Sequence, residues 1–196
     1  MSAADPRRRA VALVGFMGAG KSAVGERLAA ALALPFVDTD RLIEATAGPI
    51  PALFAERGEQ GFRALEAQVV SAAVAAAEER PSVLALGGGA VLSAEVRAAL
   101  ERLAHVVWLE APVDVLWARV TAAGTRERPL AGDKCAFTAL LEARVPLYRE
   151  VAARVMQTGA KSAATIAAEI AADLLAAPTD EGRAGVASPA AEGRRP

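Results

Sequence analysis

The segment "AVALVGFMGAGKSAVGERLAAAL" (residues 10–32) changes character twice along its length. It begins as a β-type apolar run, passes through a group of glycines and ends in a helical pattern. In its middle, Gly15, Gly20, Lys21 and Ser22 fit the spacing G-x-x-x-x-G-K-[ST] of a phosphate-binding loop. That motif requires a strand before it and a helix after it, and both are indicated here. The segment therefore predicts a phosphate-binding loop.

The residue types of this loop suit a phosphate chemically. Glycines let the backbone curl so that successive N–H groups point at phosphate oxygens, and the amino end of the helix adds partial positive charge. Lys21 is one of only three lysines among 22 basic residues, and its ammonium can reach the terminal phosphates. Ser22 offers a hydroxyl to Mg²⁺. A glycine-rich turn without function is the alternative, which the strand–loop–helix context disfavours.

Composition argues against several classes of function. The chain has 196 residues and a formal net charge of −1, so it lacks the general basic excess that holds a nucleic-acid backbone. The lone cysteine, Cys135, permits no intramolecular disulfide and fits a reducing compartment. The apolar run that follows the arginines at 7–9 ends at Lys21, and no run approaches the length of a membrane span. We therefore expect a cytoplasmic protein with no nucleic-acid or membrane partner.

Short β-type runs alternate with helical patterns along the chain, which is typical of a parallel sheet covered by helices. The fold class is thus α/β. Strands are expected at 10–15, 34–38, 82–87, 105–110 and 153–158. Helices are expected near 21–32, 39–46, 62–80, 93–104, 112–122, 134–150 and 162–176. Ser93 and Ser162 are the expected N-caps of two of these helices, and His105 is expected to pack at the start of a strand.

We expect a single domain at residues 10–176, after a short N-terminal extension at 1–9. Residues 177–196 are rich in Gly, Pro and charge without periodicity, which predicts a disordered tail. Inside the domain, "TAAGTRERPLAGDK" (121–134) is polar and basic between two helices. It fits either a plain loop or a mobile lid over a phosphate site, and the residues alone favour neither.

Two carboxylates follow the second expected strand. In "FVDTD", Asp38 and Asp40 stand at the carboxyl end of that strand, which is the edge that faces the ligand crevice in open α/β sheets. One could hold Mg²⁺ through water while the other accepts a proton from an attacking hydroxyl. Alternatively, one of them, Asp40 in particular, only caps the following helix.

Arginines and glycines supply the remaining candidates. "GFRALE" sets Arg63 and Glu66 on one helix face, either as a surface ion pair or as an Arg fork that binds a substrate carboxylate and is oriented by Glu66. Spacing alone favours the ion pair. "ALGGGAV" has three consecutive glycines at 87–89, which fit a ligand-facing turn or an ordinary tight turn. Arg128 and Arg144 are further candidates, although arginine is common throughout this chain.

Taken in order, these pieces resemble the shikimate kinases, small P-loop kinases of the nucleoside-monophosphate-kinase-like fold. The shared motifs are "GFMGAGKSAVG", "FVDTD", "GEQGFRALE", "LALGGGAV", "RPL" and "RVPLYREVA". The resemblance covers residues 10–176. It implies a three-layer α/β/α P-loop NTPase fold with a five-stranded parallel sheet of strand order 2-3-1-4-5, a mobile lid at about 121–134 and a monomeric state.

The resemblance implies transfer of the γ-phosphoryl group of ATP to the 3-hydroxyl of shikimate, a step in aromatic amino acid biosynthesis. The products are 3-phosphoshikimate and ADP. The implied phosphate-binding residues are Gly18, Ala19, Gly20, Lys21, Ser22, Ala23 and the lid residue Arg128. Mg²⁺ would be bound by Ser22, with Asp38 in its outer shell.

On the acceptor side, the resemblance makes Asp40 the candidate base for the attacking hydroxyl. Lys21 and Arg128 would stabilise the transferring phosphoryl group. Arg63 and Arg144 would bind the shikimate carboxylate. Gly88 and Gly89 would line the same pocket.

The chain departs from the family pattern at several positions. Ala131 ends "RPLA" where the family commonly has "RPLL", and Pro49 and Pro51 stand where members usually begin a short helix with fewer prolines. Thr121 replaces an Arg that stacks on adenine in many members, with Arg119 as the nearest substitute. The rival interpretations are a gluconate or adenylate kinase on the same scaffold, and a nucleotide-binding module without catalysis. Adenylate kinases usually have G-K-G-T at the end of the loop, whereas this chain has "GKSA".

Overall fold

The computed structural model of the chain describes residues 9–103, 105–122 and 133–176. Nearly all of the predicted N-terminal extension, most of the predicted lid and the whole predicted tail lie outside these residues. The same holds for Arg128 and Ala131. Within the described ranges, no helix is long and apolar enough to cross a membrane.

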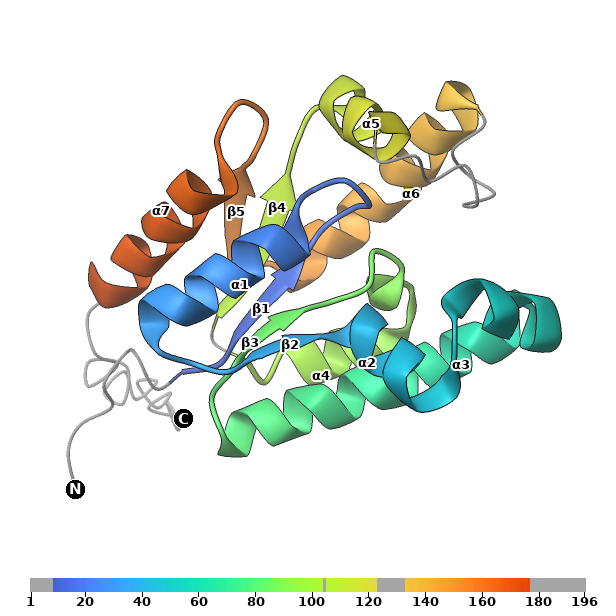
Figure 1. Cartoon of the computed structure of the whole chain (residues 1–196), viewed down its shortest axis with the longest axis horizontal. Helices are drawn as coiled ribbons and strands as arrows, with labels where there is room; N and C mark the ends of the chain where they lie inside the picture. The colour runs from blue at the N-terminus through green and yellow to red at the C-terminus, as the bar shows by residue number, and fades with distance from the viewer. Residues whose placement is uncertain (1–8, 104, 123–132, 177–196) are drawn as a thin grey trace, which may run out of the picture.

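Five parallel strands form one sheet in the order β2-β3-β1-β4-β5, which confirms the predicted strand order (Figure 1). The strands are β1 (Val11–Val14), β2 (Phe36–Asp38), β3 (Val83–Ala85), β4 (His105–Glu110) and β5 (Arg154–Gln157). At the centre, Val11 of β1 is in register with Val83 on one side and His105 on the other. The central strands are buried, whereas the edge strands β2 and β5 are partly exposed, because only an inner strand has neighbours on both sides.

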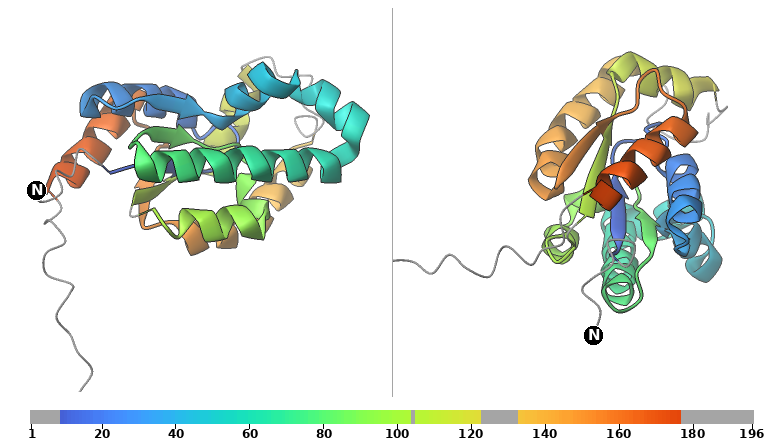
Figure 2. Two further views of the ribbon diagram at one scale, coloured as in Figure 1. Left: turned by 90° about the horizontal axis from the view of Figure 1, so that it is seen from below. Right: turned by 90° about the vertical axis from the view of Figure 1, so that its left-hand side faces the viewer.

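Helices cover both faces of the sheet, as the α/β prediction requires (Figure 2). They are α1 (Lys21–Leu32), α2 (Thr39–Ala47), α3 (Ile50–Glu79), α4 (Ala94–Leu100), α5 (Val113–Ala122), α6 (Lys134–Val151) and α7 (Ala163–Ala176), with a 3₁₀ turn η2 (Ala90–Leu92) before α4. Helices α1 and α7 pack together on one face, and α4 and α6 lie on the other. The long α3 packs beside α4.

Two helices differ from their predicted bounds by more than one residue. The helix predicted at 62–80 begins at Ile50 and bends at Gly58, whose φ of 67° interrupts the helical backbone. Pro49 is its N-cap and Pro51 lies in its first turn, where a missing N–H costs no helical hydrogen bond. The helix predicted to end at 104 ends instead at Leu100. The N-cap roles of Ser93 and Ser162 are confirmed, since each hydroxyl accepts a backbone N–H three residues later.

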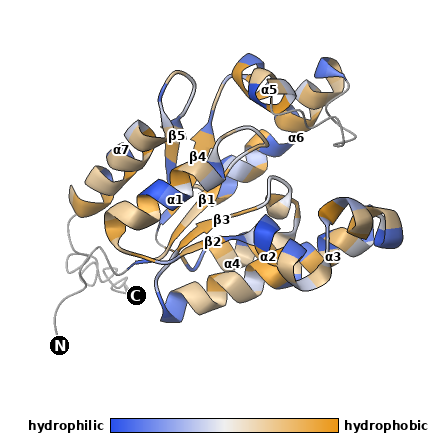
Figure 3. Ribbon diagram, viewed as in Figure 1, coloured by the Kyte–Doolittle hydropathy of each residue, from blue (hydrophilic) through white to orange (hydrophobic). Residues whose placement is uncertain are grey.

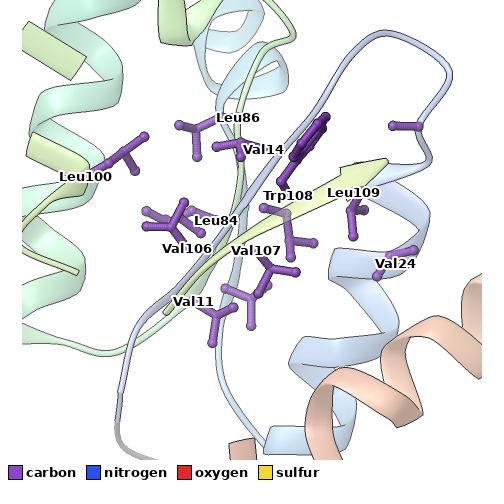
Figure 4. Close-up of a cluster of buried hydrophobic side chains, with 14 of the residues drawn as sticks. Val11, Val14, Val24, Leu84, Leu86, Leu100, Val106, Val107, Trp108 and Leu109 are labelled. Carbon is purple, nitrogen blue, oxygen red and sulfur yellow. The ribbon is translucent and has the colours of Figure 1, made fainter. Parts of the chain in front are cut away.

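The core lies where the apolar strands meet the inner faces of the helices. The hydropathy colouring makes the central strands the apolar layer (Figure 3). Residues of β1, β3, β4 and the helices interlock there, among them Val14, Leu84, Val107 and Trp108 (Figure 4). A second, smaller cluster joins α2 to α3. It supports the part of α3 that carries Arg63.

One glycine lets α1 approach β2 closely. A Cβ on Gly25, in the middle of α1, would overlap the ring of Phe36 at the start of β2. The same approach brings the start of α1 and the end of β2 together, where Ser22 and Asp38 form a hydrogen bond of 2.5 Å. The small residue in the helix interior is therefore needed for packing between elements of the site.

Replacing Gly25 with Ala reverses the usual sign of this substitution. Ala in a helix normally stabilises by about 1 kcal/mol relative to Gly, but overpacking against Phe36 costs about 1–3 kcal/mol. We expect Gly25→Ala to lower the free energy of unfolding, measured by urea denaturation. The double variant Gly25→Ala/Phe36→Leu removes the overlapping ring and should recover part of the loss. An increase in stability for Gly25→Ala alone would contradict this packing.

Candidate active site

The phosphate loop needs glycine at three positions. Gly15, Gly18 and Gly20 have φ values of 147°, 81° and 91°, in the region that favours glycine. A Cβ on Gly15 would lie 2.6 Å from the carbonyl oxygen of Leu109, and one on Gly18 would lie 2.8 Å from that of Leu116. The loop is therefore packed closely against β4 and α5.

Lys21 lies at the amino end of α1 and turns back over this loop. Its Nζ donates to the carbonyl oxygens of Gly15 (2.8 Å) and Phe16 (3.2 Å). The N-cap of α1 is Gly20, which has no side chain to bond the first-turn N–H groups. Ammonium, loop backbone and helix dipole thus act at one end of α1, as a phosphate requires.

Asp38, rather than Asp40, caps α2. Its Oδ1 accepts the backbone N–H groups of Asp40 (3.1 Å) and Arg41 (3.2 Å), and its Oδ2 accepts the hydroxyl of Ser22 (2.5 Å). The alternative that Asp40 in particular caps this helix is therefore wrong. The hydroxyl and carboxylate oxygens are donors that Mg²⁺ prefers. No group of three or more His, Cys, Asp or Glu side chains in the described ranges could hold a metal, so a cation at Ser22 and Asp38 would need further oxygens from phosphates and water.

Asp40 and Glu66 face the first residue of the triple-glycine turn. A Cβ on Gly87 would lie 2.6 Å from Asp40 Oδ1 and 2.6 Å from Glu66 Oε1. The turn itself abuts the phosphate loop, because a Cβ on Gly88 would lie 3.3 Å from the backbone nitrogen of Met17. The turn therefore lies against the two carboxylates at Gly87 and against the phosphate loop at Gly88.

Arg63 and Glu66 form a largely buried pair, not the surface ion pair that spacing alone favoured. Arg63 Nη1 lies 2.6 Å from Glu66 Oε2, and Glu66 is only 3% exposed. Burial raises the pKa of Glu66 above its ordinary value. The positive charge of Arg63 and its hydrogen bond act in the opposite direction, while the charge of Asp40 adds to the rise.

Two aromatic rings and a glycine enclose Arg63. Phe54 and Phe62 stack with centroids 4.3 Å apart, and the guanidinium lies 5.7 and 5.4 Å from their centroids. A Cβ on Gly89 would overlap the guanidinium. Gly89 is thus required for Arg63 to lie against the turn.

Arg144 reaches the same turn from α6. It is 5% exposed, and its Nη1 donates to the Gly88 carbonyl oxygen (3.3 Å) while its guanidinium carbon lies 5.3 Å from the Phe16 centroid. Tyr148, one turn later, donates its hydroxyl to the same oxygen (2.6 Å), and burial raises its pKa. Sequence reasoning assigned no role to Tyr148, although it lies in the quoted "RVPLYREVA". The sequence around a single tyrosine in a partly apolar helix does not indicate which group its hydroxyl will bond.

Arg119 links the phosphate loop to the segment after β5. Its Nη1 donates to the Gly18 carbonyl oxygen (3.3 Å), and its Nη2 donates to those of Thr158 (2.9 Å) and Gly159 (3.1 Å). Thr121 instead bonds carbonyl oxygens of its own helix. Contact of either residue with adenine stays a prediction.

The fold and these contacts define a P-loop nucleotide-binding protein whose phosphate loop adjoins a second, arginine-lined site. Comparison with known proteins specifies the family. The shikimate kinase family model matches residues 17–175, and the chain belongs to the shikimate kinase family. The reaction of this family is phosphorylation of shikimate by ATP.

Individual relatives agree with this assignment. The shikimate kinase of Symbiobacterium thermophilum is 45% identical over 164 residues, covering 82% of this chain and 92% of the relative. That of Caulobacter vibrioides is 44% identical over 155 residues, covering 78% and 76%. Among solved structures, a shikimate kinase from Acinetobacter baumannii in complex with shikimate superposes with a TM-score of 0.77 at 37% identity, covering 85% of this chain and 93% of that one.

The raised pKa of Glu66 predicts a pH-dependent contribution to stability. The folded state holds this proton more tightly than the unfolded chain, so the contribution is greatest below the ordinary pKa of glutamate and is lost as pH rises through the raised value. We expect the unfolding free energy of Glu66→Gln, relative to the parent, to increase from about pH 4 to about pH 7. Urea denaturation across that range tests this. Glu59→Gln, at a side chain that is 70% exposed, is the control, and an equal slope in both variants would contradict the prediction.

Proposed function

We propose that this chain transfers the γ-phosphoryl group of ATP to the 3-hydroxyl of shikimate at the junction of the phosphate loop and the triple-glycine turn. The observation that supports the proposal is the contact between the phosphate loop and the triple-glycine turn. Gly88 lies against Met17 of the phosphate loop on one side, and its carbonyl oxygen accepts from Arg144 on the other. A phosphate bound by the loop and a carboxylate bound by Arg144 would therefore lie on either side of Gly88.

On the nucleotide side, the backbone of residues 18–23 and Lys21 bind the β- and γ-phosphates. Lys21 exchanges its two carbonyl acceptors in the loop for phosphate oxygens, which are charged and therefore stronger acceptors. Arg128, which lies outside the described residues, is expected to supply a further positive charge to the transferring group. These cations stabilise the charge that spreads over the phosphoryl oxygens in the transition state.

Ser22 and Asp38 would hold Mg²⁺ in this proposal, Ser22 through its hydroxyl and Asp38 through its carboxylate. Their hydrogen bond of 2.5 Å supports a shared oxygen site at the end of the phosphate loop. The cation, when bound, offsets negative charge on the β- and γ-phosphates.

The monomeric state, the cytoplasmic location and the bounds of the domain, lid and tail stay predictions from the sequence.

On the acceptor side, Arg63 and Arg144 bind the shikimate carboxylate, and Gly88 and Gly89 allow the ring to approach the backbone. Asp40 accepts the hydrogen bond of the 3-hydroxyl. As the new O–P bond forms and the bond to the ADP oxygen breaks, the hydroxyl proton passes to Asp40. A loose phosphoryl-transfer transition state needs little help from a base, so orientation of the hydroxyl is a second contribution of the same carboxylate.

The choice of acceptor tests the function directly. We expect shikimate to stimulate ADP release, measured in a coupled assay, well above the rate with ATP alone. Its ring holds a carboxylate for the two arginines and a hydroxyl for Asp40 in a fixed relative position, whereas gluconate carries both groups on a flexible chain and AMP has no carboxylate. Gluconate and AMP are tested separately as acceptors. Failure of shikimate to stimulate release would contradict the proposal. ATP binding without turnover of any acceptor would indicate a binding module.

Asp40→Asn tests the role of the carboxylate while keeping its shape. If Asp40 takes the proton, kcat should fall by about 10²–10⁴-fold, with little change in the KM for ATP, because Ser22 and Asp38 are untouched. Steady-state kinetics with each substrate varied measures both. A near-normal kcat would mean that Asp40 only positions the hydroxyl.

A further inference from the structure

The β2–β3 ladder ends where the site begins. Its last register pair is Asp38 with Ala85, after which the chain turns directly into α2 at Thr39. On the opposite side of β3, the backbone N–H of Leu86 bonds the carbonyl oxygen of Leu13 in β1. The next N–H, that of Gly87, has no strand residue beside it because β2 has already ended.

The side chain of Thr39 continues the ladder at this point. Its Oγ1 donates to the carbonyl oxygen of Ala85 (3.3 Å) and accepts the backbone N–H of Gly87 (3.0 Å). The residue is completely buried. A single hydroxyl thus uses both its donor and an acceptor lone pair, on the last paired residue of β3 and on the Gly87 N–H beyond it.

These two bonds lie between the residues that our proposed function uses. Thr39 directly precedes Asp40, and Gly87 begins the turn that contains Gly88 and Gly89. There is little free space between the turn and Asp40, because a Cβ on Gly87 would lie 2.6 Å from Asp40 Oδ1. A shift of the turn relative to α2 therefore changes the gap between the Asp40 carboxylate and the wall of the acceptor pocket.

We infer that Thr39 is a positioning residue for phosphoryl transfer: its hydroxyl sets the position of Asp40 relative to the Gly87–Gly89 turn. The inference rests on the proposed function. Thr39 touches neither substrate in this role and acts only through Asp40 and the turn. The phosphate loop has further contacts of its own, with Leu109 and Leu116, so we expect the effect to fall on the acceptor much more than on ATP.

Two substitutions separate the hydroxyl from the rest of the side chain. Thr39→Val keeps the shape and removes both hydrogen bonds, whereas Thr39→Ser keeps the hydroxyl and removes a methyl group. We expect Thr39→Val to lower kcat by about 10–100-fold, the scale of a misplaced catalytic group, and to raise the KM for shikimate. The KM for ATP should stay within about twofold, and Thr39→Ser should retain most of the parent kcat.

A variant far from the site serves as the control for a loss of stability. Ile170→Ala, at a buried position of α7, supplies a loss of Tm with no expected change in kcat or either KM. Should Thr39→Val fail to fold, Thr39→Ala makes the same comparison without the hydroxyl. The inference is overturned if the variant without the hydroxyl keeps kcat within twofold of the parent, or if Thr39→Ser loses as much kcat as Thr39→Val. An equal rise in the KM for ATP would overturn it as well. If the parent chain itself does not turn over shikimate, the proposed function fails instead.

Discussion

Each oxygen of the Asp38 carboxylate bonds a different element, and the geometry of the site depends on this division. Oδ2 accepts from Ser22 at the start of α1, and Oδ1 accepts from the first turn of α2. A carboxylate bound on both sides is fixed in orientation, so the phosphate loop and α2 are fixed relative to each other. The position of Asp40 then follows, since it lies in that first turn. The hydrogen bonds of the Asp38 carboxylate thus help to set the distance between the phosphate loop and Asp40.

Buried charges and consecutive glycines meet beside Asp40, and both oppose folding. Glu66 is almost fully buried, and burial outweighs the favourable charges of Arg63 and Arg144 on its pKa. Three successive glycines add the entropy cost of ordering a flexible backbone. Local choices that conflict with stability are expected at functional sites. Here each glycine has a definite neighbour in the site, so the cost is explained by close approach and not by a need for flexibility.

The sequence predicted the sheet, its helices and the position of the phosphate loop, because these depend on local hydrophobic patterns and on one motif with strict spacing. It could not tell whether Asp38 or Asp40 caps α2, since a shift of two residues in the end of β2 would exchange their roles. It also favoured a surface location for Arg63 and Glu66, because an i, i+3 spacing says nothing about what covers the helix. Tyr148 and Thr39 escaped notice for a related reason. Their partners are backbone atoms distant in sequence. Because almost every residue has a backbone carbonyl and N–H group, such a partner cannot be recognised from residue types.

The cations of the site differ in type for a physical reason. Arg63 and Arg144 lie over aromatic rings, where a flat guanidinium can stack and still direct its N–H groups at a planar carboxylate. Lys21 lies within a curled loop, 2.8 Å and 3.2 Å from two carbonyl oxygens. A compact ammonium fits that space and can turn its three donors toward a moving phosphoryl group, whereas a rigid fork would require a wider loop. A chain that otherwise uses arginine almost throughout thus has one of its three lysines in the phosphate loop, where our proposed function requires a charge that can follow the group being transferred.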